Sequence, residues 1–191
     1  MSARYFYEGP MSIPRIETIS ESEKIWMGRM CYGEGGRKCS RDKASAMLWA
    51  IINRLFLWPA GRRYKEYEDL MRAFSQPINP RWAEGGDLAA KWAGTKYATA
   101  ARLKRRAAVS GKPWEKIPET IRTAVLDFQA GVLFPPEILT TIPRPRITNW
   151  ASLKSTPKKY PWGVDIDGDW FFEDDIYPGF VKVDPEETKE G

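Results

Sequence analysis

Glu34 is the residue of this chain whose type and setting best suit acid–base chemistry. It stands in the stretch Tyr32-Gly33-Glu34-Gly35-Gly36, where glycines surround a single carboxyl. Glycines allow a tight turn and let a ligand approach the backbone closely. An apolar wall keeps a carboxyl protonated to higher pH, and we expect Trp26, Met30, Tyr32 and the buried helix from Ala44 to supply that wall. The pattern therefore indicates a general acid just beyond a helix; the alternative is a solvated loop glutamate.

The residue types that are missing narrow the chemistry further. The chain has no histidine and two cysteines. Ser-His-Asp and Cys-His catalysis and His-ligated zinc all need an imidazole, and a four-thiolate zinc site needs more cysteines. We therefore expect no metal and no cofactor. The acid that remains near neutral pH is a carboxyl with a raised pKa, which is what glycosidases use.

Cys31 and Cys39 bracket Glu34, and the sequence leaves two states open for them. A disulfide between them would pin the loop that follows Glu34. Two free thiols are the expectation for a protein made in a reducing compartment.

Charge and hydropathy bear on the partner. The 191-residue chain carries a net charge of +5, which favours attraction to a polyanion such as nucleic acid, an anionic membrane surface or an anionic cell wall. Asn53 and Arg54 interrupt the longest apolar run, so we expect no membrane span. Residues 1–8 lack the apolar core of a secretory signal, so we expect synthesis in the cytoplasm without a signal peptide.

Helices are expected to position Glu34. The capping box of Ser20 and Glu23 begins the first, and Asp42 is expected to cap the second, which has the strongest helical period. The expected helices span 21–30, 44–55, 65–75, 87–108 and 118–131. From Pro135 onward many prolines predict irregular structure, with a short β-hairpin around 169–172. The fold class is therefore mainly α (α+β).

Several stretches together resemble the spore-cortex-lytic type of cell wall hydrolases, which belong to the lysozyme-like superfamily. These stretches are 30–36 with Glu34, 44–55 with Asn53-Arg54, 70–77 with Gln76, and the closing pieces 147–151 and 168–172. The resemblance implies a lysozyme-like helical domain with a short β-hairpin and an irregular proline-rich C-terminal segment. Where the family usually has Glu-Ala-Arg-Gly-Glu, this chain has Glu34-Gly35-Gly36-Arg37-Lys38. A second acid in that turn is therefore not implied.

The sequence pattern and the resemblance together divide the chain. We expect an extended N-terminal arm over residues 1–19, a catalytic domain over 20–175 and a solvated tail over 176–191. Within the domain, the family pattern has a gap over residues 87–116, which we interpret as an insertion or a basic helix.

The activity that the resemblance implies is cleavage of peptidoglycan glycan strands between N-acetylmuramic acid and N-acetylglucosamine, by a muramidase or a lytic transglycosylase. Glu34 would be the catalytic acid. The expected substrate-binding residues are Ser75, Gln76, Asn79, Trp82 and Asn149. Against this, Asn79 before Pro80 can simply set a turn, and Trp82 can belong to the core. A wall-degrading enzyme without a signal peptide suggests a bacteriophage protein, acting in infection or lysis, with other particle proteins as further partners.

A hydrolase would need a second carboxylate, about 5–9.5 Å from the first. The candidates are Asp42, Glu66, Glu68 and Asp69, each of which can equally be a helix cap or a solvated charge. Without a second acid, the 6-hydroxyl of the sugar can attack the anomeric carbon, and a single glutamate suffices for that transglycosylation.

Two further motifs suggest other partners. The run Arg102-Leu103-Lys104-Arg105-Arg106 can contact phosphates, although we expect a solvated helix end and do not expect nucleic acid as the main partner. Residues 165–169 begin like a calcium loop, but Trp170 and Ile176 occupy the positions that need a glycine and a carboxylate, which indicates an acidic turn. The alternative function is a non-enzymatic phage structural or nucleic-acid-binding protein with a degenerate lysozyme-like core.

Overall fold

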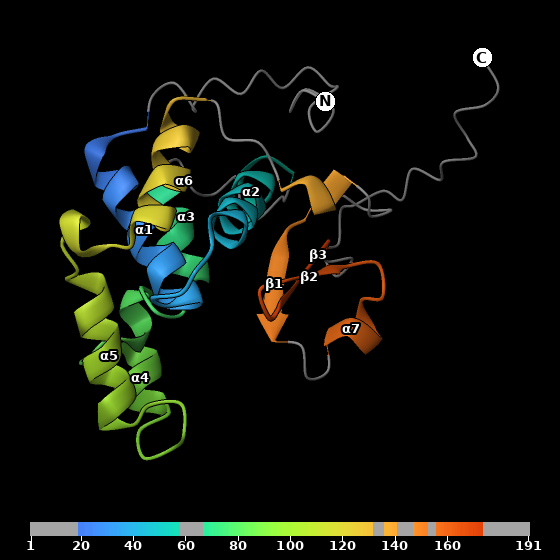
Figure 1. Cartoon of the computed structure of the whole chain (residues 1–191). Helices are drawn as coiled ribbons and strands as arrows, with labels where there is room; N and C mark the ends of the chain where they lie inside the picture. Colours follow the sequence, from blue (N-terminus) through green and yellow to red (C-terminus); the bar gives the residue numbers. More distant parts are fainter. Residues whose placement is uncertain (1–18, 58–66, 132–135, 141–146, 153–155, 174–191) are drawn as a thin grey trace.

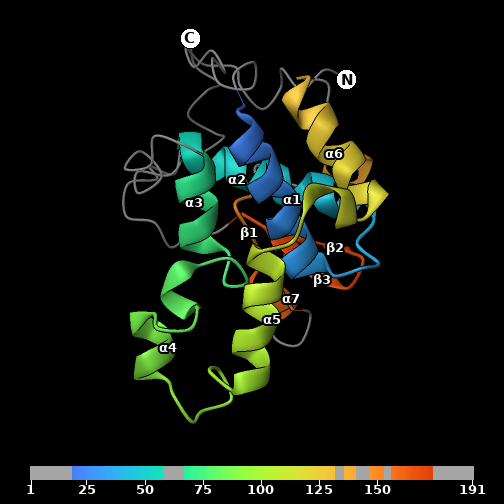
Figure 2. The ribbon, with the colours of Figure 1, turned by 90° about the vertical axis from the view of Figure 1, so that its left-hand side faces the viewer.

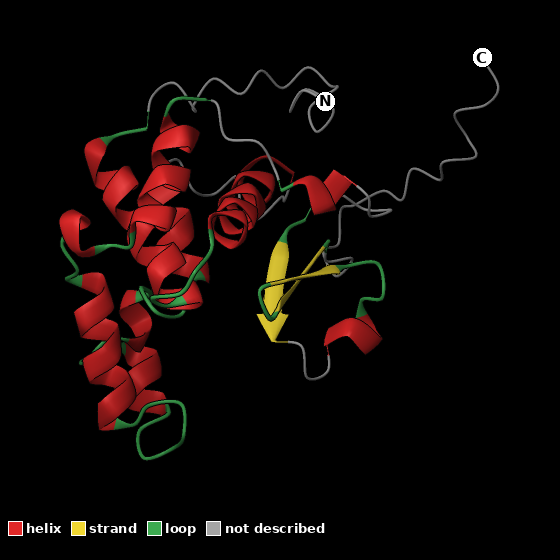
Figure 3. Ribbon diagram, in the orientation of Figure 1, coloured by secondary structure: helices red, strands yellow, loops and turns green. Residues whose placement is uncertain are grey.

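The computed structural model describes residues 19–57, 67–131, 136–140, 147–152 and 156–173. These residues form seven α-helices, three short 3-10 helices and a three-stranded sheet, so the expected mainly helical class with a small sheet is confirmed (Figure 3). The elements are α1 (Glu21–Gly35), α2 (Arg41–Leu57), α3 (Tyr67–Phe74), η4 (Pro80–Trp82), α4 (Asp87–Lys91), α5 (Ala100–Ser110), η5 (Trp114–Lys116), α6 (Glu119–Gln129), η6 (Glu137–Thr140), β1 (Asn149–Ser152), α7 (Thr156–Lys159), β2 (Val164–Ile166) and β3 (Asp169–Phe172). The predicted tail over 176–191, and the predicted arm up to residue 18, lie outside the described residues.

Helix α1 is the hub of the fold. It contacts α2, α3, α5 and α6, and α2 in turn contacts α3, α6 and strand β1. In Figure 1 the C-terminal end of α1 lies between the sheet and a lobe formed by α4 and α5, and Figure 2 shows that lobe below α1 and α3. None of the helices in the described ranges is long and apolar enough to cross a membrane.

The first helix begins as predicted and ends later than predicted. The Ser20 hydroxyl accepts a hydrogen bond from the Glu23 N–H at 3.2 Å, and the Glu23 carboxylate accepts one from the Ser20 N–H at 2.9 Å. The helix continues to Gly35 and stops at Gly36, whose φ of 73° suits glycine. Glu34 therefore lies in the last turn of α1, and the prediction that it follows the helix was wrong.

Helix α2 is buried almost all round, as its sequence indicated. Its fully or nearly fully buried apolar residues are Ala44, Ala46, Met47, Leu48, Trp49, Ala50, Ile51 and Ile52. The expected cap is corrected, because the Ser40 hydroxyl accepts a hydrogen bond from the Lys43 N–H at 3.1 Å and Asp42 is an exposed first-turn residue. The helix thus brings Lys43 and Asn53-Arg54 to its two ends.

The expected long helix over 87–108 is two helices. A turn containing Gly94 separates α4 from α5, and the Thr99 hydroxyl caps α5 by accepting a hydrogen bond from the Arg102 N–H at 3.3 Å. The buried Arg106 side chain then donates to the carbonyls of Trp82 at 3.1 Å and Tyr97 at 3.2 Å. These bonds fix α5 against η4 and the loop that precedes α5.

The predicted hairpin is present and has a third strand beside it. Asp167 and Gly168, with φ of 51° and 81°, form the tight turn between β2 and β3. The Asp165 carboxylate accepts a hydrogen bond from the Gly168 N–H at 2.8 Å, as suits the expected acidic turn. Strand β1 pairs antiparallel with β3 in the order β1-β3-β2, with Trp150 opposite Phe171.

Candidate active site

Glu34 meets partners from two separate segments at the end of α1. The buried Ser75 hydroxyl, just after α3, donates a hydrogen bond to Glu34 Oε1 at 2.8 Å. The Trp150 side chain of β1 donates a second hydrogen bond to the carboxylate. Burial raises the pKa of Glu34 above its ordinary value; the Ser75 hydrogen bond opposes this, and the negative charge of Asp169 adds to it. Glu34 is thus held in place while it keeps its proton to higher pH than an exposed glutamate.

Asn53 and Arg54 position the strand that carries Trp150. The buried Asn53 amide donates to the Ile147 carbonyl at 2.7 Å, and the Arg54 guanidinium donates to the Thr148 carbonyl. The Arg54 guanidinium also lies 5.5 Å from the centroid of the Trp150 ring. The Asn-Arg pair therefore connects α2 to the start of β1, and its positive charge lowers the pKa of Glu34, which partly offsets burial.

Asp169 is the carboxylate that acts on Glu34, and sequence reasoning missed it as a second acid. It begins β3, and its carboxylate pairs with the ammonium of Lys43 at 2.7 Å. Lys43 is buried at the start of α2 and also donates to the Asp167 carbonyl at 3.1 Å. The side chain of Asp169 remains 23% exposed, so it is anchored yet reachable by a ligand. No local pattern marked it, because its partner Lys43 is distant in the sequence.

The four carboxylates that were candidates for a second acid have other places. Asp42 is exposed on α2, and Glu66 lies outside the described residues. Glu68 accepts hydrogen bonds from Ser22 and Arg72, each at 2.8 Å. Asp69 lines a different pocket, together with Asn79 and Arg81. Asp169 takes their place as the candidate.

A pocket of about 280 Å³ opens beside Glu34. The residues that line it and bear on its chemistry are Glu34, Gln76, Arg102, Arg105, Arg106 and Val109. Gly33 allows this end of α1 to lie close to Pro77 and Val109, because a Cβ there would lie 2.5 Å from Pro77 Cβ and 3.0 Å from Val109 Cγ1. The helix that carries Glu34 thus packs directly on the Gln76-Pro77 turn and on α5.

Two of the predicted substrate-binding residues, Ser75 and Gln76, lie beside Glu34. Ser75 is buried and holds the acid, whereas Gln76 is exposed at the pocket. Trp82 is half-buried, with the Arg106 guanidinium 4.9 Å from its ring centroid. The Asn149 side chain accepts a hydrogen bond from the Trp150 N–H at 2.9 Å.

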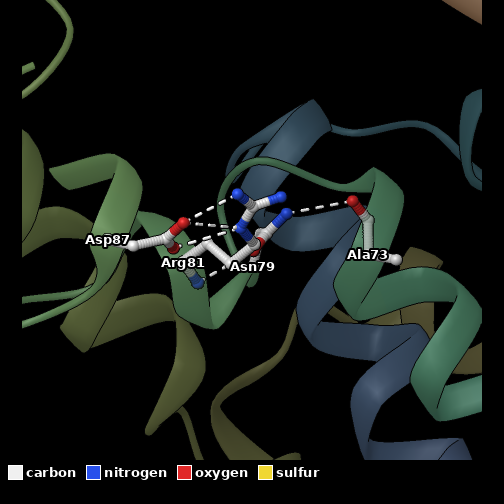
Figure 4. Close-up of polar contacts among 4 residues, drawn as sticks. All are labelled: Ala73, Asn79, Arg81 and Asp87. Carbon is white, nitrogen blue, oxygen red and sulfur yellow. Dashed lines mark hydrogen bonds and ion pairs between the residues drawn. The ribbon is translucent and has the colours of Figure 1, made fainter. Parts of the chain in front are cut away.

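Asn79 belongs to a larger pocket of about 520 Å³ that does not include Glu34. Its amide nitrogen donates to the Ala73 carbonyl at 2.9 Å, and its oxygen accepts from the Arg81 N–H at 2.9 Å (Figure 4). In the same view the Arg81 guanidinium makes a two-pronged ion pair with Asp87, at 2.7 Å for the shortest contact. Turn setting therefore occupies Asn79 in this structure.

The end of α1 that carries Glu34 has apolar neighbours from several elements. Trp26 lies between the guanidinium groups of Arg29 and Arg72, 4.6 and 4.7 Å from its ring, and Met30 lies fully buried in the core. A Cβ at Gly33 would meet Pro77 and Val109, and one at Gly35 would lie 3.8 Å from Met47 Cε, on the buried helix that was expected to contribute.

The two cysteines are free, buried thiols. Burial raises the pKa of Cys39 to about 11 and that of Cys31 well above its ordinary value. Cys39 packs against Gly35, where a Cβ would lie 2.4 Å from its sulfur. Of the two open states, the structure has the unbridged one.

No protein-family model matches the chain, and comparisons with curated proteins and with solved structures found no match either. The case for a function therefore rests on the residues around Glu34 and their geometry.

Proposed function

We propose that the chain is a lysozyme-like enzyme that cleaves peptidoglycan glycan strands between N-acetylmuramic acid and N-acetylglucosamine, with Glu34 as the general acid. The observation that carries the proposal is the setting of Glu34: a half-buried carboxyl with a raised pKa, held by Ser75 and Trp150, at the edge of an open pocket. A helical domain with a small antiparallel sheet facing the acid is in keeping with a lysozyme-like arrangement.

In the proposed reaction the protonated Glu34 donates its proton to the glycosidic oxygen as the bond to the anomeric carbon breaks. The carboxylate that results then accepts a proton from the attacking hydroxyl. That hydroxyl belongs to water in hydrolysis and to the 6-position of the same sugar in transglycosylation. Ser75 and Trp150 keep the Glu34 oxygens oriented in both steps by donating hydrogen bonds to them.

Asp169 gives the proposal a second carboxylate. The ion pair with Lys43 holds it in place, so its negative charge is available to stabilise the positive charge that develops on the sugar ring. The same charge raises the pKa of Glu34, which is the division of roles between two carboxyls that glycosidases use. The Asp169 side chain is 23% exposed, so a bound sugar could contact it.

The test is mass analysis of peptidoglycan digests made by the wild type and by Glu34→Gln. We expect the wild type to release muropeptides and Glu34→Gln to lose about 10²–10⁴-fold of that rate, because an amide donates no proton to the leaving oxygen. The control variant is Glu119→Gln, an exposed first-turn residue of α6, with wild-type activity expected. Reducing ends in the product identify hydrolysis and anhydro ends identify transglycosylation. Equal activity of Glu34→Gln and the wild type would contradict the proposal.

The setting of the activity is part of the proposal. We propose that it serves a bacteriophage, in infection or in lysis, where the net charge of +5 would favour adhesion to an anionic wall. Activity released from purified phage particles, compared with activity in lysates of infected cells, separates the two settings.

A second candidate function is nucleic-acid binding by a protein without glycan-cleaving activity. The observation in its favour is that Arg102, Lys104 and Arg105 are all exposed on α5. Arg106 does not belong with them, because it is buried and bonded to two carbonyls. DNA binding that weakens steeply with salt and disappears when the three exposed cations are neutralised, without release of muropeptides, would favour this candidate.

A further inference from the structure

The pocket beside Glu34 continues into a second pocket along α5. The second pocket has a volume of about 240 Å³ and shares Arg105 and Val109 with the first. The basic groove, as we call the two together, contains Glu34, Gln76, Arg102, Arg105, Arg37 and Lys112. It therefore has the proposed acid near one end and cationic side chains over the rest of its length.

The cations at the centre of the basic groove have no acidic partner among the described residues. Arg102 and Arg105 are exposed and lie one helical turn apart on α5, and no carboxylate in the described part of the chain forms an ion pair with either. The bonds of Arg106 to the Trp82 and Tyr97 carbonyls fix the helix from which they project. Burial, and then the positive charge of nearby Arg102, lowers the pKa of Arg106.

The far end of the basic groove is also positive. The Lys112 ammonium lies 4.2 Å from the centroid of the Tyr32 ring. Hydrogen bonds from Arg37 and Lys112 lower the pKa of the Tyr32 hydroxyl. A ligand in this groove would therefore meet guanidinium and ammonium donors on an aromatic floor, which suits a carboxylate-bearing chain.

We infer that the basic groove binds the acidic peptide stems that substitute the glycan strand. The inference rests on the proposed function, because it assigns a second part of the same substrate. In peptidoglycan the stem is attached to N-acetylmuramic acid, one of the two sugars that flank the bond proposed to be cleaved. A stem-binding site must then adjoin the catalytic acid, and the basic groove does.

Guanidinium groups fit this ligand because they bind carboxylates through two parallel hydrogen bonds. A nucleic acid would be bound differently, since phosphate contacts spread over every exposed cation on a face. Lys104 provides the distinction: it is exposed on α5 between the groove arginines in sequence, but it lines neither pocket. It is therefore the matched control for Arg102 and Arg105.

The experiment measures equilibrium binding of soluble glycan fragments to proteins that carry Glu34→Gln, so that no cleavage occurs. The probes are stem-bearing fragments, the same fragments with methyl-esterified stem carboxyls, and fragments from which an amidase has removed the stems. Combined Arg102→Ala and Arg105→Ala should weaken binding of the stem-bearing probe by roughly tenfold or more. The same pair should change binding of the esterified and stem-free probes much less, and Lys104→Ala should leave all three unchanged. Both groove variants replace exposed helix residues with alanine, and circular dichroism checks the fold.

A conservative variant tests the geometry. Arg105→Lys keeps the charge but loses the two-pronged donor, so it should weaken binding of the stem-bearing probe nearly as much as Arg105→Ala does. An effect of Lys104→Ala equal to that of Arg105→Ala would overturn the inference in favour of diffuse charge attraction. Tighter binding of the stem-free probe, whose freed lactyl carboxyl is then the ligand, would overturn the assignment to the stem. Tighter binding of a single-stranded oligonucleotide, lost in the Arg102 and Arg105 variant, would overturn it for nucleic acid.

The two proposals fail in different ways. If the wild type releases no muropeptides while the binding results hold, cleavage is refuted and stem binding stands. If Glu34→Gln abolishes cleavage while the arginine variants bind stem-bearing fragments as before, the stem-binding inference is refuted and cleavage stands.

Discussion

Two pockets are lined in part by the segment that follows α3, and they differ in how far their polar groups are already engaged. The larger, of about 520 Å³, contains Asn79 and Arg81, whose side chains bond to the Ala73 carbonyl, the Arg81 N–H and Asp87. The smaller, of about 280 Å³, contains Glu34 with its raised pKa and two arginines without an acidic partner among the described residues. Size would select the larger pocket, whereas the available chemistry selects the smaller.

A polar pocket indicates a functional site when its groups are strained or unpaired in the absence of a ligand. At the 520 Å³ pocket, Asn79 is engaged in a turn, and Arg81 and Arg72 form ion pairs with Asp87 and Glu68. At Glu34, burial of a carboxyl opposes its ionisation, which is a cost that stability alone does not explain. Substitutions in the two pockets should therefore separate activity from stability.

The largest effect after Glu34 itself is expected for Asp169→Asn. Loss of the carboxylate should reduce glycan cleavage by about 10²-fold or more, because the positive charge on the sugar loses its stabiliser. The variant also leaves buried Lys43 without its partner, so the control is the double variant Lys43→Met with Asp169→Asn. Recovery of activity in the double variant would mean that the unpaired lysine, and not the missing carboxylate, caused the loss.

The pH profile should move in opposite directions in two variants. The proposed reaction requires protonated Glu34, so activity should fall as pH rises through the raised pKa of Glu34. Ser75→Ala removes a hydrogen bond that lowers this pKa, so the alkaline limb should shift to higher pH. Asp169→Asn removes a charge that raises it, so the residual activity should decline at lower pH than in the wild type. Shifts in the same direction would mean that a group other than Glu34 sets the alkaline limb of the pH profile.

The same pKa predicts a stability difference. The folded protein holds the pKa of Glu34 above its unfolded value, so the stabilisation from its neutral form is complete below the unfolded pKa and is lost as pH rises through the folded one. Glu34→Gln stays neutral at every pH. Its stability relative to the wild type should therefore increase from acidic to neutral pH in urea unfolding. A constant difference across that range would contradict the buried setting of Glu34.

Gly33→Ala tests the close packing at the site. Its Cβ would lie 2.5 Å from Pro77 Cβ, and the overpacking should cost about 1–3 kcal/mol of unfolding free energy. Because Pro77 follows the Ser75-Gln76 turn, activity should fall as well. The control is Gly111→Ala, whose Cβ meets only the Ala107 carbonyl oxygen, at 3.3 Å, and should change stability by about 0.5 kcal/mol or less. If Gly33→Ala leaves stability unchanged, α1 lies farther from Pro77 than the structure has it.

Local signals were enough to predict much of the fold. The capping box of Ser20 and Glu23, the helical period of α2 and the start of α6 after Pro118 each depend on residues close in sequence, and each is present. The long helix over 87–108 was wrong because its apolar spacing outweighed Gly94 and the Thr99 cap, which were visible signals of a break. Asp42 was predicted to cap α2, whereas the Ser40 hydroxyl does so, and both residue types suit that role.

The site was less predictable because it is assembled over long separations. Glu34 and its neighbour Ser75 were named from residues and resemblance, but that Ser75 holds the acid depends on how α1 packs on α3. Asp169 reaches the site through the sheet and the Lys43 ion pair, neither of which leaves a local pattern. The sequence indicates Asn53-Arg54 as a motif, but only the tertiary structure shows that the pair anchors residues 147 and 148.

Asn79→Ala, in the pocket of about 520 Å³, should lower stability and leave activity nearly unchanged. The variant loses the hydrogen bonds to the Ala73 carbonyl and from the Arg81 N–H, which should cost about 1 kcal/mol of unfolding free energy. Glycan cleavage by the folded protein should stay within about twofold of the wild type, because the polar atoms of Asn79 are bonded within the protein. A tenfold change would need a loss of about 1.4 kcal/mol of substrate binding or catalysis. A fall in activity without loss of stability would instead restore Asn79 as a glycan-binding residue.

Arg81→Ala should have the smallest effect of all. Its ion pair with Asp87 is fully exposed, and such pairs contribute little because water and salt screen them. We expect stability and activity to match the wild type within error, measured by thermal unfolding at low and high salt and by the digest assay. Asp87→Ala serves as the matched variant from the other side of the pair. A clear loss of activity in Arg81→Ala but not in Asp87→Ala would mean that the guanidinium leaves its partner to bind the substrate, and that the larger pocket also belongs to the glycan-binding surface.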